Sequence, residues 1–187
     1  MKVKLIRNNK KPILVFIFII STSLSGIALS STLDGKIIKI IDGDTVYFQA
    51  NNDDAYKKLR LVGIDAPEMK QPFGYQSKQC LANLINNKHV QIISFGEDRY
   101  KRTLAKILIK KIDINLAMVK NGCAWFYRRY KNTLDKDDQV MYDQAEIFSI
   151  ENKKGLFSNQ EAEAPWDWRK KNWTIFLNTY QYKYRSS

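Results

Sequence analysis

The chain has 187 residues, of which 44% are hydrophobic and 27% are charged. This length and composition describe one globular domain, and they exclude both a chain of two ordinary domains and an intrinsically disordered chain. The chain carries 31 lysines and arginines against 19 acidic residues, for a formal net charge of +12. Such a charge suits a polyanionic partner, although a lysine-rich composition alone does not identify one.

The first thirty residues have the pattern of a secretory signal peptide. Five basic residues precede an apolar run from Ile13 to Ile20, and small residues follow as far as Ser30. We predict cleavage near Ser30 and residence in the periplasm or outside the cell, with no stable membrane association afterwards. Loss of the five basic residues leaves 26 against 19 acidic ones, a net charge of +7. The alternative is an N-terminal membrane anchor, although polar residues dilute the second half of residues 12–29.

The sequence that follows predicts short strands. Two β-rich runs, at residues 36–41 and 45–49, flank an Asp-Gly turn and predict a hairpin. A third strand is expected over residues 58–64. The chain should not continue into a helix there, because Pro67 disfavours helical backbone at the residue before it. Two further strands are expected over residues 90–95 and 103–109.

Helices are expected between and after these strands. The apolar spacing over residues 80–85 predicts an amphipathic helix that lies over a core. A short helix over residues 115–122 should end at its glycine, and a last helix should begin after Thr133 and end near Gly155. Five short strands and several helices together indicate an α+β fold.

The chain contains two cysteines, Cys80 and Cys123. An even number of cysteines in an exported chain permits one disulfide. Both cysteines also have apolar neighbours in the sequence, which is equally typical of buried free thiols. The sequence leaves both alternatives open.

Acidic and basic residues gather in three short motifs. Asp44 lies in an Ile-Asp-Gly-Asp-Thr motif, Asp65 and Glu68 lie in an Asp-Ala-Pro-Glu motif, and Arg60 precedes Asp65 by five residues. Arg102 follows far downstream. Each motif alone is typical of a turn or a surface ion pair. Together they supply the carboxylates and guanidinium groups that metal-assisted phosphodiester hydrolysis requires, because negative charge builds on the phosphate oxygens.

The inventory of side chains excludes two other mechanisms. His89 is the only histidine, so catalysis by a histidine pair and histidine-rich zinc ligation are both excluded. His89 stands at the start of an expected strand and is predicted to be structural. Carboxylates must then hold any metal, and oxygen ligands select hard cations such as Ca²⁺ or Mg²⁺.

In order and spacing, these motifs and the segment Asp98–Ala105 resemble the staphylococcal nuclease (thermonuclease) family over about residues 35–130. The later Pro-Trp-Asp-Trp-Arg motif resembles the exported bacterial branch of that family. The resemblance implies an OB-fold barrel of five strands capped by about three helices, with the nuclease domain at residues 31–155. Residues 156–187 would form an aromatic and basic extension that packs on the domain or trails it.

The resemblance also implies a calcium site. Asp44 and Asp65 would be its carboxylate ligands, and the backbone carbonyl of Ala66 would be a third ligand. The family often has threonine where this chain has Ala66, but a backbone ligand does not depend on the side chain. So few protein ligands predict weak binding of Ca²⁺, with a Kd on the order of 10⁻⁴ to 10⁻³ M.

Catalytic and substrate-binding roles are implied in the same way. Glu68 matches a glutamate that orients or deprotonates the attacking water. Arg60 and Arg102 match two arginines that stabilise the transition state through their planar forks. Contacts to the nucleotide are expected from three further residues, Tyr100, Lys101 and Tyr130.

We therefore expect a secreted or periplasmic, monomeric, calcium-dependent nuclease. It would hydrolyse phosphodiester bonds of DNA and RNA with little sequence specificity and leave 3′-phosphate ends. The alternative is a non-catalytic OB-fold protein that binds nucleic acid, as in relatives that have lost their carboxylates and arginines. This chain keeps all five of those residues: Asp44, Arg60, Asp65, Glu68 and Arg102.

Overall fold

The computed structural model describes residues 32–185, and side chains as far as residue 177. The predicted signal peptide lies outside these residues. No helix between residues 32 and 185 combines the length and the apolar character that a membrane span requires.

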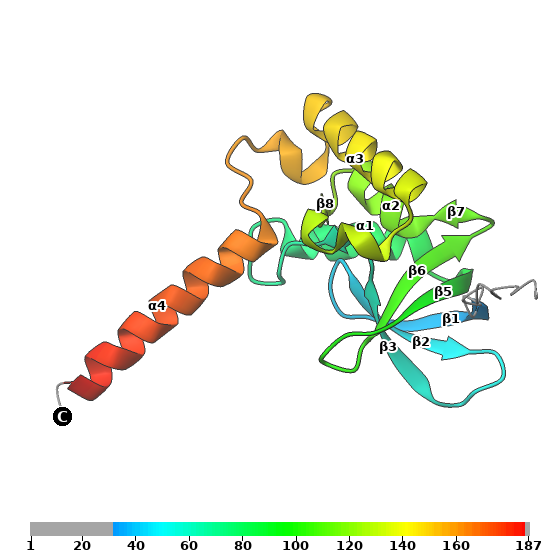
Figure 1. Ribbon diagram of the computed structural model, residues 1–187, viewed down its shortest axis with the longest axis horizontal. Coiled ribbons are helices and arrows are strands. Elements are labelled where there is room, and N and C mark those ends of the chain that lie inside the picture. Colours follow the sequence, from blue (N-terminus) through cyan, green and yellow to red (C-terminus); the bar gives the residue numbers. More distant parts are fainter. Residues whose placement is uncertain (1–31, 186–187) are drawn as a thin grey trace, which may run out of the picture.

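Five strands close into a barrel (Figure 1). Neighbouring strands run antiparallel in the order β3-β2-β1-β5-β6, and a parallel pairing of β3 with β6 completes the circle. The predicted α+β class and the OB-type barrel are therefore confirmed. The barrel strands are β1 (Thr32–Ile40), β2 (Thr45–Ala50), β3 (Tyr56–Leu61), β5 (His89–Glu97) and β6 (Thr103–Ile109). A short β7 (Ile112–Asp113) extends the sheet beyond β6.

Alternate residues of these strands point inward and form the core. Val46 and Phe48 of β2, Leu59 of β3, Ile92 of β5 and Ile107 of β6 are all almost completely buried. Their period of two is the pattern that distinguishes the strands in the sequence. This filled interior makes the barrel a rigid base for the loops at its end.

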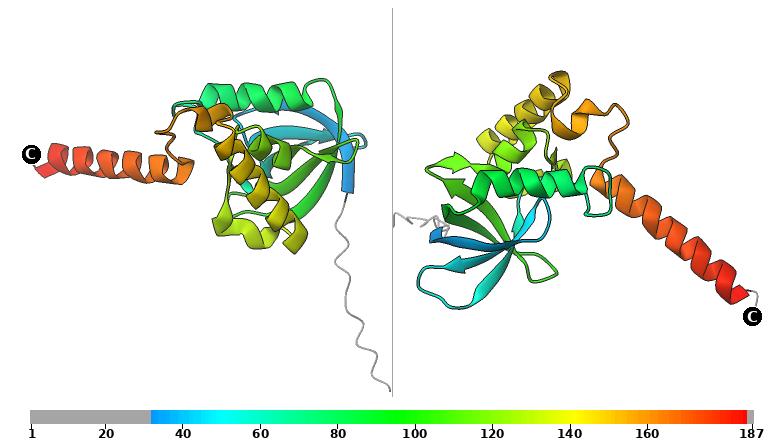
Figure 2. Two further views of the ribbon diagram at one scale, coloured as in Figure 1. Left: turned by 90° about the horizontal axis from the view of Figure 1, so that it is seen from above. Right: turned by 180° about the vertical axis from the view of Figure 1, so that it is seen from behind.

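Helices gather against one end of the barrel. Figures 1 and 2 show α1, α2 and α3 packed together there, whereas a long final helix, α4, projects away from the side opposite the β2–β3 hairpin. The helices are α1 (Gly74–Ile85), α2 (Ile114–Lys120), α3 (Lys136–Glu151) and α4 (Pro165–Arg185), with 3₁₀ turns η1 (Arg128–Thr133) and η2 (Gly155–Ser158). The sequence predicted the first three helices near these positions, but the pattern after Gly155 did not predict α4.

The third strand ends earlier than predicted, because the chain turns at Gly63. β3 ends at Leu61, and Gly63 has a left-handed φ of 75°. A Cβ at this position would lie 2.7 Å from Leu134 Cδ1, so only glycine fits both the conformation and the space. The turn starts a separate short strand, β4 (Ile64–Asp65), which pairs with β8 (Trp125–Phe126).

Asn115 holds this turn against the closure of the barrel. Its fully buried side chain donates hydrogen bonds to the carbonyls of Val62 (3.1 Å) and Ala105 (3.0 Å) and accepts one from the Ile107 amide (3.2 Å). One amide side chain thereby satisfies three buried backbone groups on β6 and on the turn after β3. The residues that follow the turn are fixed relative to the barrel as a result.

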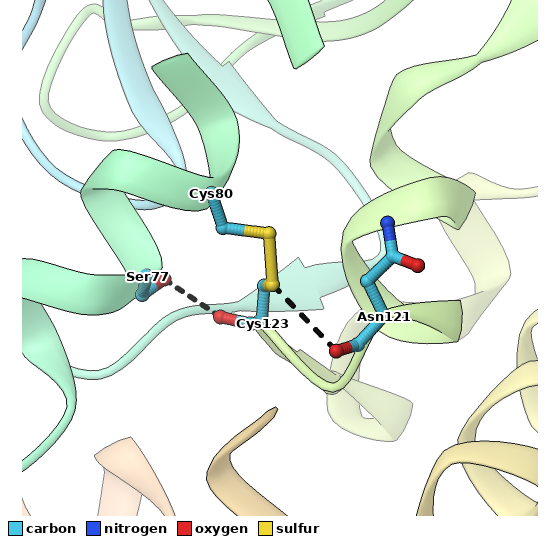
Figure 3. The surroundings of a disulfide bond; sticks show 4 residues. All are labelled: Ser77, Cys80, Asn121 and Cys123. Carbon is cyan, nitrogen blue, oxygen red and sulfur yellow. Dashed lines mark hydrogen bonds between the residues drawn. A yellow bond between two sulfur atoms is a disulfide. The ribbon is translucent and has the colours of Figure 1, made fainter. Parts of the chain in front are cut away.

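A disulfide joins α1 to the segment after α2. Cys80 and Cys123 are bonded, with their Cα atoms 6.3 Å apart, and this decides between the two alternatives that the sequence left open. Figure 3 shows Ser77, one turn before Cys80, donating a hydrogen bond of 2.6 Å to the Cys123 carbonyl. Two bonds of different kinds therefore hold α1 in place.

Removal of the disulfide should lower stability without abolishing the fold. The bond closes a loop with a sequence separation of 43, for which the chain-entropy model gives about 4 kcal/mol of stabilisation. We expect Cys80→Ser with Cys123→Ser to lower the free energy of unfolding by about 2–4 kcal/mol, measured by guanidinium denaturation. A reducing agent should destabilise the wild type equally and leave the double variant unchanged. Equal stability of the wild type in both conditions would contradict the prediction.

Candidate active site

Asp44 enters the site from the tight loop between β1 and β2, where Gly43 packs against α1. A Cβ at residue 43 would lie 1.9 Å from Ser77 Oγ and 2.7 Å from Ala66 Cβ. The φ of Gly43 lies outside the left-handed region, so this glycine serves close packing and not turn geometry. The contact sets the position of the Asp44 backbone against both α1 and the loop that carries Asp65.

Arg60 joins the two carboxylates that the sequence predicted to hold a metal. Its Nη2 lies 3.1 Å from Asp44 Oδ2 and 3.0 Å from Asp65 Oδ1. Its Nη1 donates to the carbonyls of Leu61 (2.7 Å) and Ile64 (2.9 Å), on either side of the Gly63 turn. Both fork ends of the guanidinium are therefore fixed, and the side chain is only 13% exposed.

The carboxylates around Arg60 are strongly desolvated. Burial raises the pKa of Asp65, against the opposing effect of its bonds to arginine. Burial and the nearby charge of Asp44 raise the pKa of Asp42 to about 6. Asp44 itself accepts hydrogen bonds from the Ala66 amide (2.7 Å) and from Thr45 Oγ1 (3.1 Å). Several acidic groups thus share one small volume, which favours the presence of cations.

Glu68 lies at the edge of this group and is tied to the approach to α4. Its backbone amide donates to Gln71 Oε1 (3.1 Å), and Gln71 Nε2 donates to the Glu163 carbonyl (2.6 Å). The Glu68 side chain is 41% exposed, in contrast to the buried Asp44 and Asp65. Its carboxylate therefore has access to water.

Arg102 faces the same cleft from the β5–β6 turn, where Asp98 holds it. Asp98 Oδ2 accepts from Arg102 Nε (2.7 Å) and lies 2.7 Å from Arg102 Nη2. Hydrogen bonds from Arg102 and from the Tyr100 amide outweigh the effect of burial and lower the pKa of Asp98. The ionised carboxylate orients the guanidinium, and the Tyr100 ring lies 5.5 Å from it.

A third guanidinium reaches the site from α4. Arg169 Nη2 lies 2.6 Å from Asp65 Oδ2, and its Nη1 lies 2.8 Å from Glu68 Oε1. These bonds outweigh burial and raise the pKa of Arg169. Sequence reasoning assigned Arg169 only to an aromatic and basic extension, because 101 residues separate it from Glu68. Its only signal in the sequence is its place directly after the pair Trp166 and Trp168.

Most of the predicted site residues line one cleft of about 760 Å³. Asp44, Arg60, Asp65, Ala66, Glu68 and Arg102 all contribute to its walls, as do Tyr100 and Tyr130. Lys101 is exposed at the tip of its turn and is not among the lining residues. His89 bonds the Gly35 carbonyl at 2.8 Å and does not line the cleft. The lining residues that the sequence did not predict include Tyr127, Arg129, Trp166 and Arg169.

The donor set fits a hard divalent cation. Asp44 and Asp65 converge on a single guanidinium nitrogen, so oxygens of both carboxylates already surround one positive charge. The part of the chain that the structure describes holds no group of three or more acidic, histidine or cysteine side chains arranged as a metal site. A cation here would therefore depend on two carboxylates, with backbone carbonyl, water or phosphate oxygens completing its shell.

Comparison with known proteins agrees with this site. The model of the family described as "Staphylococcal nuclease homologue" matches residues 58–159, more than half of the chain. The chain belongs to the staphylococcal nuclease family. A Haemophilus influenzae protein named "Uncharacterized endonuclease" is 36% identical over 162 residues, which cover 87% of this chain and 86% of the relative. A Shigella flexneri "Micrococcal nuclease" is 35% identical over 145 residues, 73% of this chain and 80% of the relative.

As a member of the staphylococcal nuclease family, the protein is a hydrolase that acts on nucleic acid. The cleft has the chemistry for this reaction. Two guanidinium groups, Arg60 and Arg102, face a space bounded by buried carboxylates and by the water-accessible Glu68. Such groups neutralise the charge that develops on phosphate oxygens and position a nucleophile.

Gly43→Ala should destabilise the protein through its contact with Ser77. The new methyl group cannot share the space with Ser77 Oγ, so α1 or the Asp44 loop must shift. We expect a loss of about 1–3 kcal/mol of unfolding free energy, the usual scale for overpacking, measured by chemical denaturation. Combined with Ser77→Ala, which removes the nearest atom, the loss should be smaller than the sum of the two single losses. Strict additivity would contradict the proposed contact.

Proposed function

We propose that the protein is a calcium-dependent nuclease that hydrolyses phosphodiester bonds of DNA and RNA with little sequence specificity. The observation that carries the proposal is the Arg60 bridge, which brings Asp44 and Asp65 together beside Glu68 and Arg169. Asp44, Asp65 and the Ala66 carbonyl would hold Ca²⁺. Bound there, Ca²⁺ supplies positive charge to the scissile phosphate.

Glu68 is the group that directs the attacking water. Its carboxylate is partly exposed and lies on the same cleft as the buried aspartates, so a water that it holds is close to a phosphate bound over them. Glu68 accepts the proton of that water as oxygen attacks phosphorus. The bond between phosphorus and the 5′ oxygen breaks, and that oxygen takes a proton from solvent, so the products carry a 3′-phosphate and a 5′-hydroxyl.

The arginines stabilise charge on the phosphate in different ways. Arg60 is held by four contacts and is nearly buried, so its position changes little when substrate binds. Asp98 is the only ion-pair partner of Arg102 in the described chain, and Arg102 reaches the cleft from a turn. One fixed guanidinium and one more exposed guanidinium can together bond to the phosphate oxygens in both the ground state and the transition state.

Loose specificity follows from the surface of the cleft. Its lining includes arginines, which bind phosphate, and the rings of Tyr100, Tyr127 and Tyr130, which can stack on any base. Backbone contacts and stacking carry little sequence information. The cationic chain adds a salt-dependent attraction for the substrate.

Cleavage should require Ca²⁺ and the predicted catalytic residues. We expect wild-type protein to degrade single-stranded and duplex DNA with Ca²⁺ and to stop when a chelator is added. Glu68→Gln and Arg102→Ala should each lower kcat by at least about 100-fold, the scale for loss of one acid-base or electrostatic group. Exposed Glu151→Gln on α3 is the matched control and should retain the wild-type rate.

Binding experiments separate this proposal from a non-catalytic role. A protein that only binds nucleic acid would retain DNA in a gel shift and produce no fragments with Ca²⁺. The nuclease should both bind and cut DNA. Its affinity for Ca²⁺, measured by calorimetry, should be lower in the Asp44→Asn variant. If Glu68→Gln and Arg102→Ala both cut at the wild-type rate, the assignment of the site is wrong.

We also propose that the nuclease is exported. The basic start, apolar run and small residues that end at Ser30 support this. Mass spectrometry of protein recovered from a secreting bacterial host should give a mature N-terminus close to residue 31. A full-length mass in the membrane fraction would instead support the N-terminal anchor.

A further inference from the structure

A second hollow, which we name the α4 groove, lies beside the active-site cleft. It has a volume of about 700 Å³ and runs between the loop that contains Met69 and Lys70 and one face of α4. Trp168, Trp173 and Phe176 supply most of the apolar surface on the helix side. Trp173 and Phe176 are three residues apart and share one face of α4, whereas Trp168 lies roughly 140° from Trp173 around the helix axis.

The α4 groove adjoins the cleft. Glu68 and Arg169 line both hollows. Since Arg169 touches both Asp65 and Glu68, the groove starts at the group of atoms that would surround the scissile phosphate. A nucleic-acid strand that extends from the cleft past Arg169 would therefore reach the groove.

The first turn of α4 is anchored to the nuclease domain, and this fixes the start of the groove. The Trp166 ring stacks on Tyr127 with centroids 5.4 Å apart and an interplanar angle of 17°. Pro165 is buried, and the Glu163 carbonyl accepts the bond from Gln71. The groove is therefore a feature of the folded domain, built by groups that are themselves held in place.

Two rings that line the groove are largely exposed to solvent. Trp173 is 62% exposed, and its ring stacks on that of Phe176 with centroids 5.6 Å apart. Lys70 and Arg169 line the groove beside these rings, and Glu68, which pairs with Arg169, lines it as well. Flat apolar faces beside cations match one class of ligand especially well, a strand whose bases are unpaired and whose backbone is anionic.

We propose that the α4 groove is a subsite for single-stranded nucleic acid, in which unpaired bases next to the scissile phosphate stack on Trp173 and Phe176. The proposal rests on the proposed nuclease function and extends it. A duplex keeps its bases stacked inside the helix, so it cannot use these rings. The subsite therefore gives the nuclease a preference for unpaired strands that its cleft alone does not provide.

The test measures binding while cleavage is blocked. A chelator is added, and the affinity of a fluorescent oligothymidine and of a duplex of equal length is measured by anisotropy. We expect Trp173→Ala to weaken binding of the single strand about tenfold, the scale for loss of one stacked base, and to change duplex binding less than twofold. Trp173→Phe should retain most of the affinity because it keeps a ring.

Tyr56→Ala is the matched control. Tyr56 is 66% exposed, as Trp173 is 62% exposed, but it stands at the first residue of β3, by the β2–β3 hairpin and far from α4 (Figure 1). Its loss should leave both affinities unchanged. Salt titration is a second measurement: Trp173→Ala should lower the affinity at every salt concentration without changing the slope, whereas Lys70→Ala should reduce the slope.

A measurement on the wild type does not depend on any variant. An oligonucleotide with 2-aminopurine near its middle should lose fluorescence on binding if the base stacks on an indole ring, and the loss should disappear with Trp173→Ala. Circular dichroism of each variant checks that the fold is kept. Unchanged single-strand binding in a folded Trp173→Ala variant would overturn the proposal.

The remaining outcomes are equally decisive. If Trp173→Ala binds the single strand as wild type does but changes the molecular mass in solution or the retention on lipid vesicles, the groove is an interface with a second copy or with a membrane. If the wild type binds single strands through Trp173 but never cuts with Ca²⁺, the subsite stands and the proposed function fails. Cleavage that is insensitive to Trp173, with unchanged binding, rejects the subsite alone.

Discussion

The guanidinium of Arg60 is the interaction on which the rest of the site depends. Without it, the buried Asp44 would lose its ion-pair partner in the described part of the chain and Asp65 would keep only Arg169, and an uncompensated buried charge costs about 3–5 kcal/mol. The barrel provides what this contact needs. The β3–β6 pairing closes at Arg60, the Gly63 turn reverses the chain, and Asp65 returns within reach of the same side chain. Closure of the barrel and assembly of the site are thus one event.

The barrel strands and the charged residues of the site could be predicted from short sequence patterns. Alternating apolar residues gave the barrel strands within a few residues, and the acidic and basic motifs gave the residues that now line the cleft. The end of the third strand was missed because residues 58–64 have one continuous strand pattern, and the need for glycine at position 63 comes from Leu134 and Tyr142, which are far along the chain. The role of Gly43 was hidden in the same way, because Asp-Gly is an ordinary turn pair whereas the actual constraint is α1.

Two features required the folded chain. The spacing of Cys80 and Cys123 says nothing about their distance in space, and only the packing of α1 against the segment after α2 makes the bond possible. Arg169 belongs to a stretch whose aromatic and basic composition fits many surfaces. Its place at Asp65 depends on the stacking of Trp166 on Tyr127 and on the Gln71 bond, neither of which leaves a periodic signal in the sequence.

The balance of charge connects these features. At the inner end of the cleft, Asp44 and Asp65 bond to Arg60, and Asp65 and Glu68 bond to Arg169. These three carboxylates exceed the two guanidinium groups bonded to them by one negative charge, and Asp42 lies near enough to Asp44 to feel its charge, so this end of the cleft favours a cation. In its absence, the raised pKa of Asp42, about 6, allows a proton to relieve part of the repulsion. Since Arg169 already occupies Asp65 Oδ2, a cation that binds this oxygen frees the guanidinium. The nearest remaining partner of Arg169 is Glu68, at the opening of the α4 groove, where an incoming phosphate would meet it.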